Sequence, residues 1–184
     1  MSPFLAPVEK PHGLMLKLAY FFTRKQFGKT ITPLKVMAAR LPTGFGMFFP
    51  KVEQLNKQLE LPLETQLLFR NQVAVLNQCP FAMDSHRWAL VKWSVKAEKF
   101  EVLESYRTNP LFSEAERAAL DYITELTENR KVRPETFQRL AHHYSERQIC
   151  EIVWIVSTEF LLNITNLGLN VPSDGLYDLI RQKN

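Results

Sequence analysis

Two residues able to do chemistry, Cys79 and His86, stand seven positions apart near the middle of the chain. Pro80 follows the cysteine, and proline is favoured at the first position of a helix, so we expect Cys79 to cap a new helix. There the free backbone N–H groups and the helix dipole favour a thiolate, which makes cysteine a better nucleophile. The pattern therefore predicts a reactive thiol, against the alternative of a small buried thiol that only packs.

His86 lies two helical turns beyond Cys79 on the same face and is the candidate acid or base. Seven residues span about 10 Å along a helix axis, so we expect no direct contact between the two side chains on a straight helix. Asp84 and Glu64 are the nearest acids in the sequence. Neither shares the face of Cys79, so each could relay a proton only if the backbone departs from a regular helix.

Helices must position these residues, because only six glycines occur among the 184 residues and apolar side chains recur at helical spacing. Two capping boxes, Ser113 with Glu116 and Ser145 with Gln148, mark helix starts. The pattern leaves residues 43–49 open between a helix start and a loop. The predicted helices cover residues 11–28, 33–42, 52–59, 62–78, 79–95, 98–106, 113–127, 134–144 and 145–167, with a short terminal helix after residue 172.

The sequence of residues 79–86, Cys-Pro-Phe-Ala-Met-Asp-Ser-His, resembles the core motif of the carboxymuconolactone decarboxylase family, which includes the alkylhydroperoxidase D-like proteins. In many members the motif reads Cys, any residue, aromatic, Cys, three residues, His, with a Glu twelve positions before the first Cys. The helix around Asn163 is similar to the closing helix of the family. The resemblance spans residues 62–167 and implies an all-α, multi-helical alkylhydroperoxidase-like fold, with a core of residues 61–184 and a helical extension of residues 1–60 packed on it as one structural domain.

Cys79, Phe81 and His86 match the motif, but Ala82 replaces the second Cys and Leu67 replaces the Glu. Family peroxidases attack peroxide with the second Cys, close a disulfide with the first, and move protons with the Glu and the His. Alanine and leucine can do none of this. The resemblance with these losses implies little or no dithiol peroxidase activity and a single-thiol remnant of the site, which is at most a weak oxidoreductase.

Two alternatives remain open. The first is a decarboxylase or other lyase, or a lactone-processing enzyme, that uses His86 as acid or base. An apolar pocket lined by Phe81, Trp88 and Trp154 would favour it. The second is a non-catalytic oligomer that keeps the fold and has lost the chemistry.

The remaining cysteine and histidines do not suggest a metal site. Zinc sites use spacings such as C-x₂₋₄-C and H-x₃₋₅-H, whereas here each Cys lies seven residues from its nearest His. We expect His142 and His143 to lie at a helix C-terminus, where their charge suits the dipole. Cys150 stands in an apolar run and is predicted to be a buried core thiol, less reactive than Cys79. No cofactor or metal is predicted.

Composition limits the partners. The net charge of +4 is dispersed along the chain, which indicates solvated helix ends and no nucleic-acid surface. No apolar stretch reaches the roughly 18 residues of a membrane span, and the N-terminus does not look like a signal peptide, so a cytoplasmic protein is expected. A small-molecule substrate is compatible with the motif. The resemblance implies a homo-oligomer, a dimer, trimer or hexamer, such as an antioxidant enzyme of this family would form.

Overall fold

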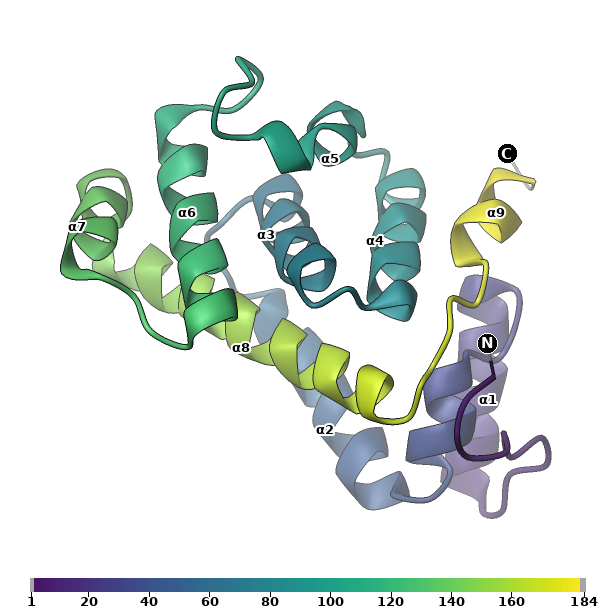
Figure 1. Ribbon diagram of the computed structural model, residues 1–184. Coiled ribbons are helices and arrows are strands. Elements are labelled where there is room, and N and C mark those ends of the chain that lie inside the picture. The colour runs from purple at the N-terminus through teal and green to yellow at the C-terminus, as the bar shows by residue number, and fades with distance from the viewer. Residues whose placement is uncertain (1, 183–184) are drawn as a thin grey trace.

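The computed structural model describes residues 2–182, without the side chains of residues 45 and 46. Within this range the chain is all-α and contains no strand, as the sequence predicts. The α-helices are α1 (Leu14–Phe27), α2 (Pro42–Asn56), α3 (Leu63–Leu76), α4 (Pro80–Lys92), α5 (Glu98–Glu101), α6 (Glu114–Asn129), α7 (Pro134–His143), α8 (Glu146–Gly168) and α9 (Leu176–Arg181). Figure 1 shows their arrangement.

The helix boundaries follow local signals in the sequence. Both predicted capping boxes form: the Ser145 hydroxyl accepts from the Gln148 N–H at 3.2 Å, and the Gln148 side chain accepts from the Ser145 N–H at 3.1 Å. The box at Ser113 has the same pattern. Gly28 ends α1 with φ 82°, a left-handed conformation that costs glycine no steric strain.

One segment that the sequence left open is now assigned, and two segments differ from the sequence prediction. Residues 43–49 belong to α2, which begins with Pro42 at its first position and continues through Pro50. A π-helical turn, η1 (Leu34–Ala38), lies within the segment predicted as a helix over residues 33–42. The helix predicted over 98–106 is split into α5 and a 3₁₀ turn, η2 (Leu103–Ser105), because Val102 leaves helical geometry at φ −112° and ψ 18°.

The core lies where α3 packs between α8 and α6, with α4 on the remaining side of α3 (Figure 1). Phe69 of α3, Ile123 of α6 and Ile152 and Ile155 of α8 are all fully buried in one apolar cluster. Burial of such side chains contributes about 1.5–3 kcal/mol each. The helix pair α3 and α4 and helix α8 therefore lie at the centre of the fold.

Helix α8 is long and apolar enough to cross a membrane by length and composition alone. It is also the central core helix, packed against α3, α6, α7 and α4. Its buried face carries polar residues, among them Glu151, Glu159 and Asn163. Length and composition alone do not distinguish a core helix of this kind from a membrane span.

The N-terminal helices pack against the end of the chain, where α1 contacts α2 and α9. Leu16 and Tyr20 are the buried residues of α1, and the Tyr20 hydroxyl donates to the Val8 carbonyl at 2.6 Å. A second set of apolar residues, which recurs at helical spacing along α1, faces outward. Its members are exposed: Leu14 by 75%, Leu18 by 47%, Phe21 by 60% and Phe22 by 59%.

Candidate functional site

Cys79 is the N-cap of α4, as the Cys-Pro pair predicts. Gln78 turns the chain with φ 52°, and the Cys79 N–H then donates to the Ala74 carbonyl at 3.0 Å, which ties the turn to α3. Pro80 starts the helix at its first position. The thiol is thus fixed between the end of α3 and the start of α4.

The predicted ease of ionisation of Cys79 is wrong. Cys79 is fully buried, and this burial raises the pKa of its thiol above the ordinary value. The backbone N–H groups of Ala82 and Phe81 and the side chain of Asn166 lower the pKa, although the sulfur makes no capping hydrogen bond. The charge of Glu159 raises it further. Desolvation outweighs the helix terminus, so the pKa of the thiol is raised where the sequence analysis expected it to be lowered.

Glu159 of α8 is the acid that the sequence analysis missed. Its Oε2 atom lies 3.4 Å from His86 Nε2 and 3.8 Å from Arg70 Nη1. The carboxylate side chain is only 2% exposed, and His86 is buried beside it. A buried carboxylate between a histidine and an arginine is arranged to exchange a proton with the histidine, with the arginine offsetting its charge.

Several buried polar atoms around this pair have no hydrogen-bond partner in the described part of the chain. They are Arg70 Nη2, His86 Nδ1, Glu159 Oε1 and both side-chain polar atoms of Asn163. Asn163 lies one turn beyond Glu159 on α8, and Asn166, next to Cys79, follows it on the same side. Buried polar groups without partners are rare, and they are typical of functional sites. Cys79, His86 and Glu159, with Asn166 next to the thiol, therefore form one polar seam where α8 faces α3 and α4.

Asp84 is not part of this seam, which corrects the prediction that it could relay protons. Its carboxylate accepts three backbone N–H groups of the C-terminal segment, from Asp174 at 3.1 Å, Leu176 at 2.9 Å and Tyr177 at 3.0 Å. Both oxygens are thereby occupied, because the first turn of α9 needs acceptors for its free N–H groups. Asp84 anchors the C-terminal segment to α4.

The two positions that depart from the family motif carry apolar side chains that are buried in the core. Leu67 is 5% exposed in an apolar cluster with Trp88 and Leu176, and Ala82 is buried against Cys79 and Ala74. Glu64, the other acid considered, is exposed in the first turn of α3. Neither Leu67 nor Glu64 can provide the carboxylate, and Glu159 reaches the site from a different helix.

The three aromatic residues predicted to line one apolar pocket are not together. Phe81 and Trp88 pack in the same cluster as Leu67, with the Trp88 ring 4.5 Å from the Phe27 ring. Trp154 instead donates from its indole N–H to the Asn56 side chain at 2.9 Å, toward α2. The sequence could not show this, because which neighbour each face of α8 meets depends on the packing of helices far apart in the chain.

Cys150 is exposed near the start of α8, which contradicts its predicted burial. Its neighbours Ile149 and Ile152 face the core, and the helical period places Cys150 on the opposite side. Because an exposed thiol meets reagents without unfolding, we now expect Cys150 to be alkylated faster than Cys79. His142 and His143 lie in the last turn of α7, as predicted.

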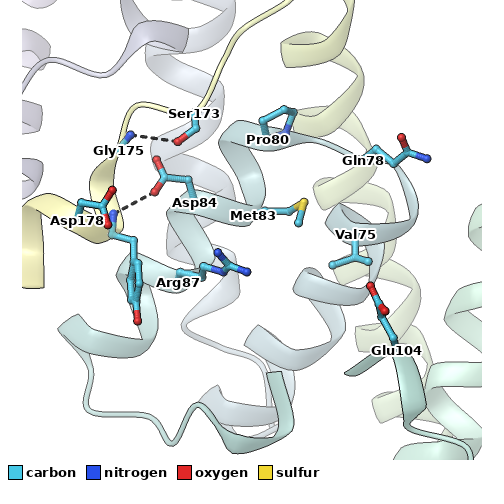
Figure 2. A pocket seen from close by; sticks show the side chains of 11 residues that line it. Val75, Gln78, Pro80, Met83, Asp84, Arg87, Glu104, Ser173, Gly175 and Asp178 are labelled. Atoms are coloured by element: carbon cyan, nitrogen blue, oxygen red, sulfur yellow. Dashed lines mark hydrogen bonds between the residues drawn. The ribbon is translucent and has the colours of Figure 1, made fainter. Parts of the chain in front are cut away.

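A surface pocket of about 540 Å³ is lined by residues of α3, α4, η2 and the C-terminal segment with α9 (Figure 2). Gln78 and Pro80, the neighbours of Cys79 in sequence, both line it. Met83 lines it as well and also packs against the cluster that holds Cys79. The other lining residues are Val75, Asp84, Arg87, Glu104, Ser173, Gly175, Tyr177 and Asp178. Cys79 itself is fully buried and does not line the pocket, and Met83 connects the pocket to the cluster that holds Cys79.

Comparison with known protein sequences gives two distant relatives. The chain is 25% identical to the uncharacterized protein YnjA of Escherichia coli (strain K12) over 171 residues, 89% of this chain and 90% of YnjA. It is 26% identical to the uncharacterized protein YdfG of Bacillus subtilis (strain 168) over 108 residues, 58% of this chain and 74% of YdfG. No model of a protein family matches the chain.

Solved structures are more informative. The debrominase Bmp8, solved as a cysteine-to-alanine variant with 2,3,4-tribromopyrrole, gives a TM-score of 0.80 at 16% identity, covering 100% of this chain and 98% of Bmp8. An uncharacterized peroxidase-related protein from Silicibacter sp. TM1040 gives 0.80 at 17% identity, covering 97% and 96% of the two chains. An uncharacterized peroxidase-related protein from Ralstonia eutropha JMP134, described as an alkylhydroperoxidase AhpD core, gives 0.75 at 16% identity, covering 96% and 98%. The chain therefore has the all-α alkylhydroperoxidase AhpD-like fold, which confirms at the level of fold the resemblance carried by residues 79–86.

Proposed function

We propose that the protein is a thiol-dependent oxidoreductase that reduces a small hydroperoxide with a single thiol, Cys79. The observation that carries the proposal is the placement of Glu159, which lies 3.4 Å from His86 and close enough to Cys79 for its charge to raise the pKa of the thiol. A carboxylate is thus present at the site, although Leu67 stands where the family motif has its Glu. The thiol, the imidazole and the carboxylate are the groups that the reaction needs.

In the proposed reaction the Glu159–His86 pair accepts the proton of the Cys79 thiol. The thiolate attacks the peroxide oxygen, the O–O bond breaks, and the leaving alkoxide takes the proton back from His86. Cys79 becomes a sulfenic acid and the hydroperoxide becomes an alcohol. The N–H groups of Phe81 and Ala82 stabilise the thiolate while it exists. Cys79 here takes the attacking role that the second Cys has in family peroxidases.

The lyase alternative loses its expected support, because Phe81 and Trp88 do not share a pocket with Trp154. The fold of Bmp8 favours a second electrophile for the same thiol, a bromine on a small aromatic ring such as 2,3,4-tribromopyrrole.

We propose that the protein works in the cytoplasm, where both of its cysteines stay reduced.

The test uses protein in which the exposed Cys150 is replaced, Cys150→Ser, so that only Cys79 can react. One equivalent of cumene hydroperoxide is added, and dimedone traps the sulfenic acid for mass spectrometry. We expect one dimedone adduct on Cys79 and none in the Cys79→Ser, Cys150→Ser control. If peroxide is consumed equally by both proteins, or if Cys79 stays unmodified, the proposal is wrong. A parallel incubation with 2,3,4-tribromopyrrole, with bromide release as the readout, tests the second electrophile.

A further inference from the structure

An oxidised Cys79 cannot be reduced by a second cysteine of the same chain. Ala82 occupies the neighbouring position of the first helical turn, and the other cysteine, Cys150, lies 16 residues before Asn166 on α8. That separation is about 24 Å along the helix axis, while a disulfide needs Cα atoms within about 7 Å. Because Asn166 marks the position of Cys79 beside α8, the reducing sulfur must come from another molecule.

Because Cys79 is fully buried, we expect such a molecule to approach it from the surface pocket that Met83 lines. Gln78 and Pro80 flank the thiol in sequence, and both line the pocket. The side chain of Met83 alone is shared between the pocket and the cluster around the thiol. In Figure 2 this side chain points from α4 toward Val75 on α3. Methionine has three rotatable side-chain bonds and repacks at low cost, so a change of rotamer can admit a sulfur atom to Cys79.

The pocket carries charges of both signs. Arg87 on α4, Glu104 on η2 and Asp178 on α9 are exposed at its rim, and none of them pairs with another side chain in the described part of the chain. Figure 2 shows Arg87 between Asp178 on the left and Glu104 on the right. Asp84 also lines the pocket, but its oxygens are occupied by backbone N–H groups. A ligand with one carboxylate and one ammonium group would complement this lining.

We propose that this pocket binds a zwitterionic low-molecular-weight thiol, an amino-acid or dipeptide thiol, as the reductant of Cys79. Its carboxylate pairs with Arg87, and its ammonium group pairs with Asp178 or Glu104. The volume of about 540 Å³ lies within the range of small-molecule sites, about 300–1,000 Å³. The inference rests on the proposed single-thiol function and adds the class of its second substrate.

The reaction balances with two molecules of this thiol. The first attacks the sulfenic acid of Cys79, forms a mixed disulfide and releases water. The second attacks the mixed disulfide, restores the Cys79 thiol and leaves as the small-molecule disulfide. Two thiols are oxidised to one disulfide, and one hydroperoxide is reduced to alcohol and water.

The kinetic test measures how fast oxidised Cys79 reacts with four small thiols in the Cys150→Ser protein. They are L-cysteine, which is zwitterionic, 3-mercaptopropionate, which is anionic, cysteamine, which is cationic, and 2-mercaptoethanol, which is neutral. Arg87→Gln is compared with Lys92→Gln, which removes an exposed cation of the same helix outside the pocket. Because each thiol is compared between variants, its own reactivity cancels.

We expect Arg87→Gln to slow L-cysteine and 3-mercaptopropionate by about three- to fivefold, the effect of one partly exposed ion pair. Cysteamine and 2-mercaptoethanol should react at the unchanged rate, and Lys92→Gln should leave all four rates unchanged. The double variant Asp178→Asn, Glu104→Gln should slow the reactions of L-cysteine and cysteamine, because these two thiols carry an ammonium group. Equal effects on all four thiols, or none, would overturn the proposal.

A binding measurement separates this proposal from the proposed function. S-methyl-L-cysteine has no reactive sulfur, and we expect it to shift the backbone NMR signals of Gln78, Met83 and Arg87 in the reduced protein, more weakly in Arg87→Gln. If no sulfenic acid forms on Cys79 but these shifts occur, the oxidoreductase proposal fails and the pocket is retained. If the signals do not move, the pocket assignment fails whatever Cys79 does.

Discussion

Glu159 opposes the ionisation of Cys79 but assists its proposed reaction with peroxide, and the two effects can be measured separately. Its charge raises the pKa of the Cys79 thiol, in addition to the larger effect of burial. The Glu159→Gln change should therefore lower the pH at which Cys79 ionises, while the maximal rate of sulfenic acid formation falls by about a hundredfold. The rate falls because His86 loses the partner that holds its proton for the leaving alkoxide.

The measurement is the pH profile of Cys79 oxidation in the Cys150→Ser protein. A raised thiol pKa means that the wild-type rate keeps rising with pH beyond about 8.5, where an unperturbed cysteine has half ionised. Glu128→Gln, a change at an exposed carboxylate of α6, is the control and should leave the profile unchanged. A purely structural role for Glu159 would lower the rate without moving the profile.

Ala82 is the residue that limits reduction by dithiols. Wild-type protein should turn over hydroperoxide slowly with a dithiol reductant, because no disulfide can close within the first turn of α4. Ala82→Cys places a sulfur against Cys79, with which Ala82 already packs, and should raise this turnover by about tenfold. Coupled consumption of the reduced dithiol protein thioredoxin measures it.

Two further variants sharpen this experiment. Ala82→Ser adds a hydroxyl of similar size and should give no gain. Leu67→Glu, which the family motif suggests as a companion change, should instead destabilise the fold, because it buries a carboxylate beside Trp88. A gain of activity from Leu67→Glu would show that the acid belongs on α3 and that Glu159 is dispensable.

The sequence predicted half of this site. Cys79 and His86 follow from local spacing, because both lie on the helix that Pro80 starts. Glu159 lies 73 positions after His86, and only the packing of α8 on α4 brings the two together. A signal was present, since an acid in the apolar stretch of residues 152–162 must find a partner when its helix is buried. The burial of Cys79 depends on α3 and α8 together, so capping alone could not reveal it.

At the scale of the helices, the carboxylate of Glu151 attaches α8 to the segment that leads into α3. This carboxylate accepts hydrogen bonds from the backbone N–H groups of Glu60 at 2.9 Å and Leu61 at 3.0 Å, and from Nε of Arg147 at 3.1 Å. Burial opposes its ionisation, but these donors outweigh burial and lower the pKa of Glu151. Glu151→Gln should lower the free energy of unfolding by about 2 kcal/mol, the cost of weakening charge-assisted hydrogen bonds.

Urea unfolding at several pH values checks this. A lowered pKa means that the stabilisation is present above about pH 4.3, the ordinary glutamate value, and is lost as the pH falls through the folded-state pKa. The variant should therefore lose less stability in acid than the wild type. Glu53→Gln, at an exposed position of α2, is the control. Equal stability of all three proteins at neutral pH would contradict the assignment.

Helix starts were the most predictable feature at this scale. Ser113 and Ser145 each carry their own cap, so four residues suffice to locate the start of α6 or α8. Pro50 was misleading, because proline usually ends a helix, and here α2 continues through it. Which face of α1 is buried could not be read from its sequence either, since its larger apolar side chains point outward.

At the scale of the whole molecule, this outward face leads us to propose a homo-oligomer. Phe21 and Phe22 of α1 and Met47 and Phe48 of α2 are exposed on two helices that contact each other, and exposed large apolar side chains are typical of subunit interfaces. Light scattering after size-exclusion chromatography should give a mass that is a multiple of 21.4 kDa. A mass of one chain across concentrations would refute the proposal.

A pair of variants locates the interface. Phe21→Glu should shift the protein toward the monomer, because a charge in an apolar interface lacks a partner. Gln26→Glu introduces the same charge at an exposed polar position of the same helix and should leave the mass unchanged. If both variants assemble like the wild type, the contact lies elsewhere on the molecule.

The carboxylate of Asp84 also orders events during synthesis. On the ribosome α4 emerges about 90 residues before the N–H groups that Asp84 will hold. Until residues 174–177 leave the exit tunnel, the pocket lacks the wall that Ser173, Gly175 and Tyr177 provide. A nascent chain can therefore fold its central helices before this pocket exists. The pocket should become able to bind a ligand only when the C-terminal segment docks on α4.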